Sequence, residues 1–100
     1  MAAAEPRHWP TNEHRDLFET IASLRTKDEV QRFLRDLCTR SELDAMAHRW
    51  RVARLLDEGL PYLEVAKRAH GSTTTVTRVA QWLRQGEGGY RLALQRRRRH

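Results

Sequence analysis

Apolar residues recur at helical spacing along most of this chain. The clearest stripe follows Thr26-Lys27-Asp28-Glu29, a capping-box sequence, and it consists of Val30, Phe33, Leu34, Leu37 and Cys38. Positions i, i+3, i+4, i+7 and i+8 lie on one face of an α-helix. The pattern therefore predicts an amphipathic helix that opens at Thr26, with Cys38 as a small buried hydrophobe on its apolar face.

Five further segments have the same character, and they lie at about residues 11–24, 39–58, 61–70, 72–84 and 90–95. Thr11, Thr39 and Ser72 are suitable N-cap residues, Pro61 suits a first helical turn, and Gly59 suits a helix end. The threonine-rich run at 73–77 favours a strand by propensity, but the valines and leucine around it recur at helical spacing. We therefore predict an all-α fold of about six helices without strands.

The chain is long enough for one domain core but not for two. Residues 1–10, which contain two prolines, are expected to form a flexible N-terminal arm. Residues 11–95 form the predicted helical domain, in which Trp50 and Trp82 occupy core-compatible positions. Residues 96–100, with the arginines at 96–99, are expected to be a disordered basic tail with non-specific affinity for phosphate.

Residues 61–84 have the pattern of a helix-turn-helix. Val65, Ala66 and Ala69 would face inward from the first helix, and Val76 and Val79 would pack back onto it from the second. Two helices that cross at a short turn need a small residue at closest approach and a turn-permissive residue, which Ala66 and Gly71 supply. The alternative is an ordinary helical hairpin whose threonine-rich face is only solvated.

The basic charge is concentrated in the C-terminal part of the chain. The formal net charge is +6, yet residues 1–60 hold 10 Lys and Arg against 11 Asp and Glu, and residues 61–100 hold nine against two. Such an excess suits a polyanionic partner, although a basic tail by itself only aids solubility. The candidate DNA-binding residues are expected on the outer face of the second helix or at the flanks of the groove that it enters: Lys67, Arg68, Ser72, Thr73, Thr74, Thr77, Arg78 and Arg84. Hydroxyl side chains would approach the bases, and basic side chains would hold the phosphates.

Several segments resemble the tryptophan-repressor (TrpR) superfamily, and in particular its YerC/YecD-type TrpR-like branch. These segments are Leu34-Arg35-Asp36-Leu37-Cys38-Thr39, Ser41-Glu42-Leu43, Arg49, Leu55-Leu56, Glu64-Val65-Ala66, Ser72-Thr73-Thr74-Thr75-Val76-Thr77-Arg78 and the ending at residues 89–94. The resemblance covers about residues 17–94. It implies an intertwined homodimer whose two helix-turn-helix heads address successive major grooves of double-stranded DNA, about 34–36 Å apart.

The resemblance also implies a small-molecule effector pocket. Its matching positions are Thr39, Arg49, Thr75 and Arg78. Where the tryptophan-binding members have a glycine and a serine, this chain has Val79 and Trp82, whose bulk would fill space that free tryptophan needs. We therefore expect that L-tryptophan is not the corepressor, and the sequence names no other effector.

Other functional classes lack a signal in the sequence. The single cysteine and five dispersed histidines have no metal-ligand spacing, no nucleophile-base constellation appears, and no nucleotide-binding glycine motif is present, so neither an enzyme nor a cofactor is expected. No apolar run is long enough for a membrane span, and the first residues have no secretory pattern, so a cytoplasmic protein is expected. The leading hypothesis is a dimeric, sequence-specific DNA-binding transcription regulator that acts as a repressor. The alternatives are an adaptor that binds proteins of the transcription machinery, and a non-specific nucleic-acid binder that uses the arginine tail.

Overall fold

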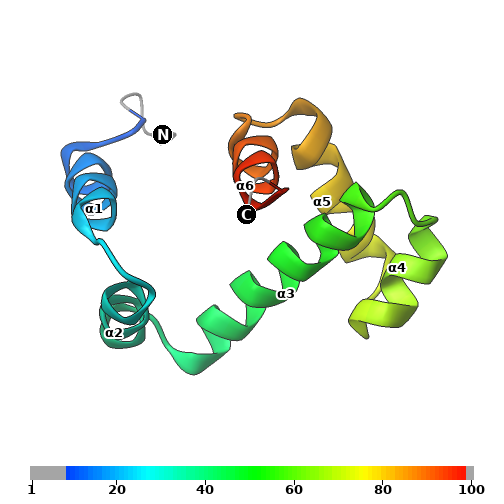
Figure 1. Ribbon diagram of the computed structural model, residues 1–100, viewed down its shortest axis with the longest axis horizontal. Coiled ribbons are helices and arrows are strands. Elements are labelled where there is room, and N and C mark those ends of the chain that lie inside the picture. Colours follow the sequence, from blue (N-terminus) through cyan, green and yellow to red (C-terminus); the bar gives the residue numbers. More distant parts are fainter. Residues whose placement is uncertain (1–8, 99–100) are drawn as a thin grey trace, which may run out of the picture. The chain divides into compact units, whose positions relative to one another are not determined.

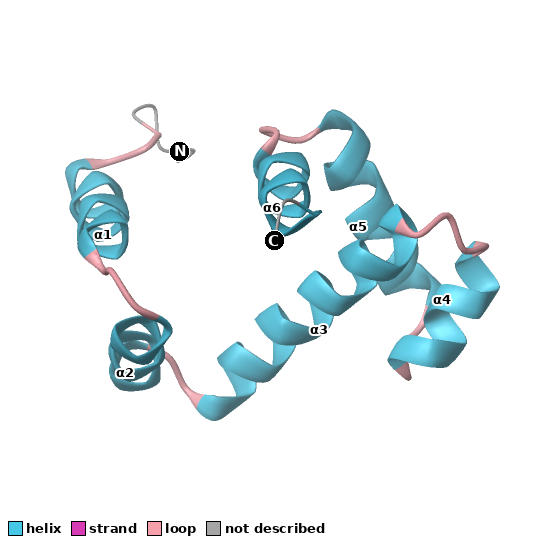
Figure 2. Ribbon diagram, in the orientation of Figure 1, coloured by secondary structure: helices cyan, strands magenta, loops and turns pink. Residues whose placement is uncertain are grey.

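The computed structural model describes residues 9–98 of the chain, and over these residues the regular secondary structure is entirely helical (Figure 2). The six helices are α1 (Asn12–Ser23), α2 (Lys27–Leu37), α3 (Arg40–Asp57), α4 (Tyr62–Ala69), α5 (Thr73–Gln85) and α6 (Gly89–Arg98) (Figure 1). They divide into two compact units. The N-terminal unit ends at Thr39 and contains α1 and α2, and the C-terminal unit begins at Arg40 and contains α3–α6. The predicted all-α class is confirmed.

Both helices of the N-terminal unit begin at the predicted caps. The Thr11 hydroxyl accepts a hydrogen bond from the His14 N–H (3.2 Å), and the His14 Nδ1 accepts one from the Thr11 N–H (3.0 Å). In α2, the Thr26 hydroxyl accepts from the Glu29 N–H (3.1 Å), whereas the Glu29 carboxylate accepts from the Arg25 N–H (2.7 Å). Each cap satisfies amide groups that the first helical turn leaves without partners.

Neither α1 nor α2 contains a buried residue. Cys38 is half-buried and follows the end of α2 as its C-cap. The prediction of a buried cysteine inside the helix was therefore wrong. The amphipathic stripe correctly indicated a helix, but a stripe becomes buried only where another element covers it.

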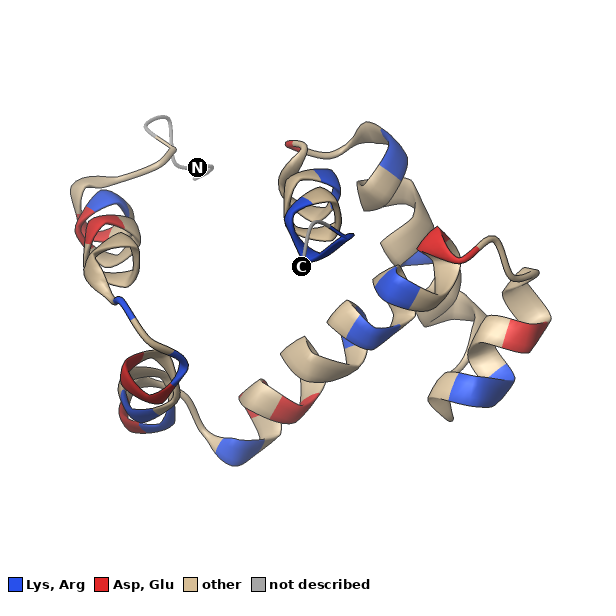
Figure 3. Cartoon of the chain, in the orientation of Figure 1, with Lys and Arg blue, Asp and Glu red and all other residues tan. Residues whose placement is uncertain are grey.

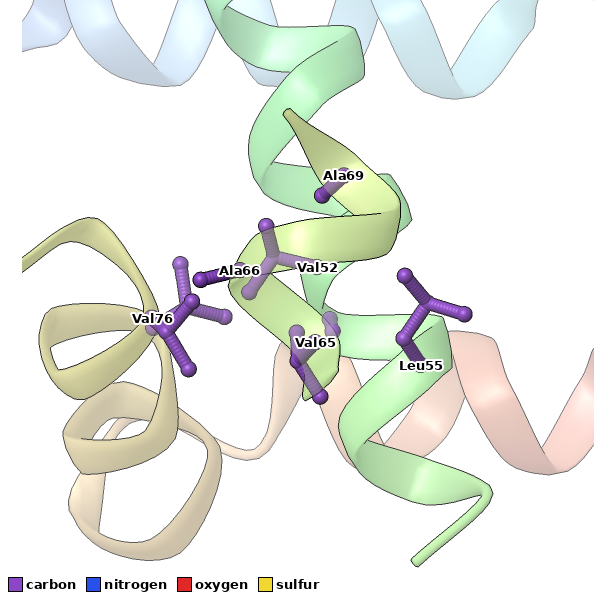
Figure 4. Close-up of a cluster of buried hydrophobic side chains, with 8 residues drawn as sticks. Val52, Leu55, Val65, Ala66, Ala69 and Val76 are labelled. Carbon is purple, nitrogen blue, oxygen red and sulfur yellow. The ribbon is translucent and has the colours of Figure 1, made fainter. Parts of the chain in front are cut away.

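The core lies in the C-terminal unit. Helix α3 packs against α4, α5 and α6, and α5 packs against both α4 and α6. The core cluster consists of small and branched side chains: Val52, Ala53, Leu55, Val65, Ala66, Ala69, Val76 and Val79 (Figure 4). In the close-up, Ala66 of α4 faces Val76 of α5, as the spacing of these two residues predicts. Val52, which has no exposed surface, was not singled out by the sequence pattern.

In the C-terminal unit, one predicted helix end is confirmed and another is corrected. Gly59 follows α3 with φ of 86°, a left-handed conformation that favours glycine. Helix α6 continues to Arg98, beyond the predicted end at Gln95. Arginine has a high helix propensity, basic residues suit the last turn, and Arg98 forms an ion pair with Asp57 of α3. Residues 96–98 are therefore helical rather than disordered, while 99–100 and the arm at 1–8 lie outside the described residues.

Candidate nucleic-acid interface

A tight connection joins α4 to α5, and its geometry is that of a helix-turn-helix. His70 has φ of 56° and ψ of 44°, a left-handed conformation. Its N–H donates hydrogen bonds to the carbonyl oxygens of Ala66 and Lys67. The Gly71 N–H donates to the Ala66 carbonyl at 3.0 Å. These bonds satisfy carbonyl groups at the end of α4 and turn the chain sharply. The predicted helix-turn-helix segment thus has the predicted connectivity.

Gly71 contributes to this turn in a different way from the predicted one. The left-handed residue of the turn is His70, and Gly71 is needed for space instead. A Cβ atom at Gly71 would lie 2.5 Å from Nε2 of His48, whose ring projects from α3. Because real Cβ atoms do not approach so closely, the absent side chain allows the turn to pack against α3.

Helix α5 has one buried face and one exposed face. Val76, Val79 and Ala80 are buried, which fixes the rotation of the helix about its axis. The hydroxyl-bearing and basic side chains predicted to meet DNA are exposed on the rest of its surface: Thr73, Thr74, Thr77, Arg78 and Arg84. The rotation is a consequence of core packing, so the same valines that build the core present these side chains to solvent.

Hydrogen bonds constrain some of the predicted hydroxyl groups. The Ser72 hydroxyl accepts from the Thr75 N–H at 3.2 Å and is the N-cap of α5. The Thr77 hydroxyl donates to the Thr73 carbonyl at 2.9 Å. The hydroxyl groups of Thr73 and Thr74 make no hydrogen bond with another described residue. These two hydroxyl groups are therefore free to engage a ligand.

The basic residues around the turn fall into two groups. Arg68 pairs with Glu64 at 2.9 Å, and Arg84 donates to the Tyr62 hydroxyl at 2.8 Å, which links α5 to α4. The side chains of Lys67 and Arg78 are exposed and have no hydrogen bond or ion pair with another described residue. Figure 3 shows the resulting distribution in the C-terminal unit, in which basic positions occur on every helix and acidic ones are few. Helices α4 and α5 together hold four basic residues and one acidic residue, Glu64.

Of the four residues of the expected effector pocket, three belong to the C-terminal unit. Arg49 and Arg78 are exposed, and Thr75 is half-buried. Thr39 belongs to the N-terminal unit. Of the two bulky residues, Val79 is buried in the core as expected, whereas Trp82 is 62% exposed. The expectation that Trp82 packs in the interior was wrong, because the valines of α5 occupy the face that meets α3 and α4.

Two further findings concern the described residues as a whole. No three His, Cys, Asp or Glu side chains among them are close enough together to hold a metal ion. None of the helices they form is both long and apolar enough to cross a membrane.

Comparison with known proteins places this arrangement in a family. The family model described as "Trp repressor protein" matches residues 12–98, which include all six helices. The chain belongs to the Trp repressor family. Its members are regulators rather than enzymes, so this protein is a Trp repressor-like regulator.

Three relatives support the assignment to the Trp repressor family. YerC of Bacillus subtilis (strain 168), an uncharacterized protein, is 41% identical over 80 residues, which are 80% of this chain and 77% of YerC. A TrpR-like protein from Eubacterium eligens ATCC 27750 is 36% identical, with a TM-score of 0.81 over 87% of this chain and 90% of that one. A Staphylococcus aureus protein described as a candidate Trp repressor is 30% identical, with a TM-score of 0.82 over 88% of each chain. The resemblance noted in the sequence is thereby confirmed, including its YerC-type character.

Proposed function

We propose that this Trp repressor-like regulator binds double-stranded DNA sequence-specifically as a homodimer, and that it inserts α5 into the major groove. One observation carries the proposal: α5 buries its valines against α3 and α4 while it exposes Thr73, Thr74, Thr77 and Arg78. A major groove admits one α-helix, and short hydroxyl side chains can bond base edges or contact thymine methyl groups. A protein with this role would act in the compartment that holds the DNA, here expected to be the cytoplasm.

The basic residues would contribute affinity rather than sequence preference. Lys67 and Arg78 are the principal candidates for phosphate contacts because no other described residue neutralises them. Arg68 and Arg84 already have partners, Glu64 and Tyr62, and would need to share or exchange them. Arg96–Arg98 on α6 would add a sequence-independent attraction that weakens as salt increases.

The homodimer is supported by apolar surface that the single chain leaves uncovered. Phe18, Ile21, Leu37 and Met46 are large apolar residues of α1, α2 and α3, and all of them are exposed. Neither α1 nor α2 buries any residue. Uncovered apolar faces of this extent favour association, and a two-fold dimer would carry two copies of α5 for two DNA half-sites.

In-vitro selection of DNA from a random pool tests the proposal directly. We expect a two-fold symmetric consensus whose half-sites are separated by about one helical turn, 10–10.5 base pairs. A bound pool with no consensus, retained only through the arginines of α6, would contradict sequence reading and would favour the non-specific binder. Failure to retain DNA at low salt would favour the protein-binding adaptor.

Two conservative variants separate the contributions of the Thr74 hydroxyl and methyl groups. Thr74→Val removes the hydroxyl and keeps the shape, whereas Thr74→Ser removes the methyl group and keeps the hydroxyl. If Thr74 reads a base, one variant should lose about 1–3 kcal/mol of preference for the consensus over a changed base pair. Gln85→Ala, at the exposed C-terminal end of α5, is the matched control. An unaltered preference in both Thr74 variants would exclude Thr74 from base reading.

The salt dependence of binding tests the phosphate contacts. Lys67→Ala and Arg78→Ala should each weaken binding to all DNA sequences alike and reduce the slope of log K against log salt by about 1. Arg32→Ala is the control, since Arg32 is an arginine of α2 that pairs with Asp28. A change in the preferred sequence without a change in slope would assign base contacts to these residues instead.

We also propose that L-tryptophan is not the corepressor, a proposal supported by the buried Val79 side chain at the position where tryptophan-binding members have glycine. Isothermal titration with L-tryptophan should show no saturable heat. Saturable binding that strengthens DNA binding would contradict this part of the proposal and leave the DNA-binding role intact.

A further inference from the structure

The last turn of α5 is held by hydrogen bonds rather than by burial. The buried residues of α5 end at Ala80, so the final turn at residues 81–85 adds no buried side chain to the core. The start of the helix is joined to α4 by the turn, and its middle packs on the core through valines. Because hydrophobic packing is non-directional, it permits small changes in the tilt of the helix. The direction in which α5 projects therefore depends on what fixes its C-terminal end.

Arg91 of α6 binds the C-terminal end of α5. Its Nε donates to the Leu83 carbonyl oxygen at 2.9 Å, and its Nη2 donates to the Arg84 carbonyl oxygen at 3.0 Å. Both carbonyl groups are among the last four of α5, which have no partner within the helix. The positive charge of Arg91 also suits a helix C-terminus. Since a guanidinium group is planar and its donors have a fixed arrangement, two such bonds define a direction as well as a distance.

Helix α6, which carries Arg91, is itself fixed to the core. Leu94 is buried and lies three positions after Arg91, on the same side of the helix. Tyr90 packs against the core cluster, and the ion pair of Arg98 with Asp57 attaches the other end of α6 to α3. The position of Arg91 is therefore set by the core, and its two hydrogen bonds impose that position on the end of α5.

Arg84 extends the hydrogen bonding to α4. Its Nη1 donates to the hydroxyl oxygen of Tyr62, the first residue of α4, at 2.8 Å. Arg84 thus accepts a hydrogen bond from α6 through its carbonyl oxygen and donates one to α4 through its side chain. Arg91, Arg84 and Tyr62 form one continuous chain of hydrogen bonds across α6, α5 and α4. Neither Arg91 nor Tyr62 belongs to the predicted DNA-contacting set.

We propose that Arg91 and Tyr62 are positioning residues for α5. They set the direction in which the helix projects and thereby the placement of its exposed threonines against base edges. The inference rests on the proposed function, since it assigns to these two residues an effect on sequence preference without contact with DNA. Supporting contacts must hold a recognition group within about 0.5 Å and 10–20° of its productive geometry. Loss of the hydrogen bonds should therefore weaken binding to the consensus more than binding to unrelated DNA.

Two measurements on the full chain separate the direction of α5 from DNA binding itself. Residual dipolar couplings of backbone N–H groups, measured by NMR without DNA, report the direction of α5 relative to α3. The ratio of the affinities for the selected consensus and for an unrelated duplex, measured at one salt concentration, reports sequence preference. Arg91→Ala should change the couplings of residues 81–85 and lower the ratio about tenfold. Arg91→Lys keeps the charge but not the planar pair of donors, and it should lower the ratio about threefold.

A second variant and a matched control complete the set. Tyr62→Phe removes one hydroxyl group without a change of charge, and it should also change the couplings and lower the ratio about threefold. Arg96→Ala removes a positive charge from an exposed position of α6 whose side chain bonds no other described residue. It should weaken binding to both duplexes alike and leave the ratio and the couplings unchanged.

The outcomes distinguish this inference from the proposed function. An unchanged ratio in Arg91→Ala, with or without changed couplings, would overturn the positioning role of Arg91 and leave its hydrogen bonds a contribution to stability alone. An unchanged ratio in Tyr62→Phe would remove Tyr62 from the proposal. If the unaltered chain selects no consensus, the proposed function fails, and the couplings by themselves decide whether Arg91 directs α5.

Discussion

Both units of this chain contain amphipathic helices, but the units differ in what the apolar faces contact. All ten buried hydrophobic side chains of the described residues lie in the C-terminal unit, among α3–α6. The N-terminal unit has correct caps and a regular apolar stripe in α2, yet no residue of α1 or α2 is buried. The difference teaches that helix formation is decided locally, whereas burial requires a partner surface. In the proposed homodimer, that surface belongs to the second copy.

The largest expected effect comes from placing a charge in the C-terminal core. Val52→Asp should cost more than about 4 kcal/mol, since Val52 is fully buried and no basic side chain is among its core neighbours. A loss of that size approaches the whole stability of a small domain, so cooperative unfolding in urea, followed by circular dichroism, should disappear. Ala45→Asp, at an exposed position of the same helix, should leave the transition in place. A normal transition for Val52→Asp would contradict the assignment of the core to this unit.

The next effect tests the N-terminal unit. Phe33→Ala should raise the dissociation constant of the homodimer by at least about tenfold, because it removes the contacts of the Phe33 ring with the second copy. Sedimentation equilibrium measures this constant. Gln31→Ala, on the polar face of α2, is the control and should have no effect. An unchanged dissociation constant for Phe33→Ala would show that α2 does not contribute to the homodimer interface. The second copy would then not be the surface that covers the apolar face of α2.

A smaller effect concerns the contact between the turn and α3. Gly71→Ala should lower the free energy of unfolding by about 1–3 kcal/mol, because the new methyl group overlaps the ring of His48. Adding His48→Ala should recover part of this loss, so a double-mutant cycle in urea should show coupling. Gly89→Ala makes the same substitution where no atom lies within 4 Å, and it should cost far less. Additive losses would show that the ring does not meet the turn.

The smallest effect compares local interactions in the two units. Thr11→Ala and Ser72→Ala each remove an N-cap hydroxyl, and each should cost about 1 kcal/mol. The two losses should be similar, because a cap acts on its own first turn whatever the rest of the helix contacts. Thermal unfolding at one protein concentration measures both, and replacement by Ser and Thr respectively should restore stability. A loss of stability in Ser72→Ala but not in Thr11→Ala would mean that the contribution of a cap depends on how the rest of its helix is packed.

Much of the fold was predictable because its determinants are local. Thr11, Thr26 and Ser72 are caps as predicted, and Gly59 ends α3. The helix-turn-helix was predictable from the spacing of Ala66 and Val76. The length of α6 was not, because its last turn is reinforced by an ion pair with Asp57, a residue 41 positions earlier in the chain.

The candidate site likewise has a part that the sequence predicted and a part that it did not. The exposure of Thr73, Thr74 and Thr77 follows from the helical period once Val76 and Val79 are assigned to the core. That Arg84 is paired could not be predicted, because its partner, the Tyr62 hydroxyl, belongs to another helix.

The sequence alone determined the number of helices, their starting residues and the amphipathic faces, since these depend on interactions within a few positions along the chain. Only the tertiary structure decided which apolar faces are covered. Val52 lies in the core although the sequence pattern did not single it out, whereas Trp82 lies at the surface beside Glu87 and Tyr90. The physical reason is that burial lowers the free energy only where two apolar surfaces meet, and a sequence pattern identifies only one of the two.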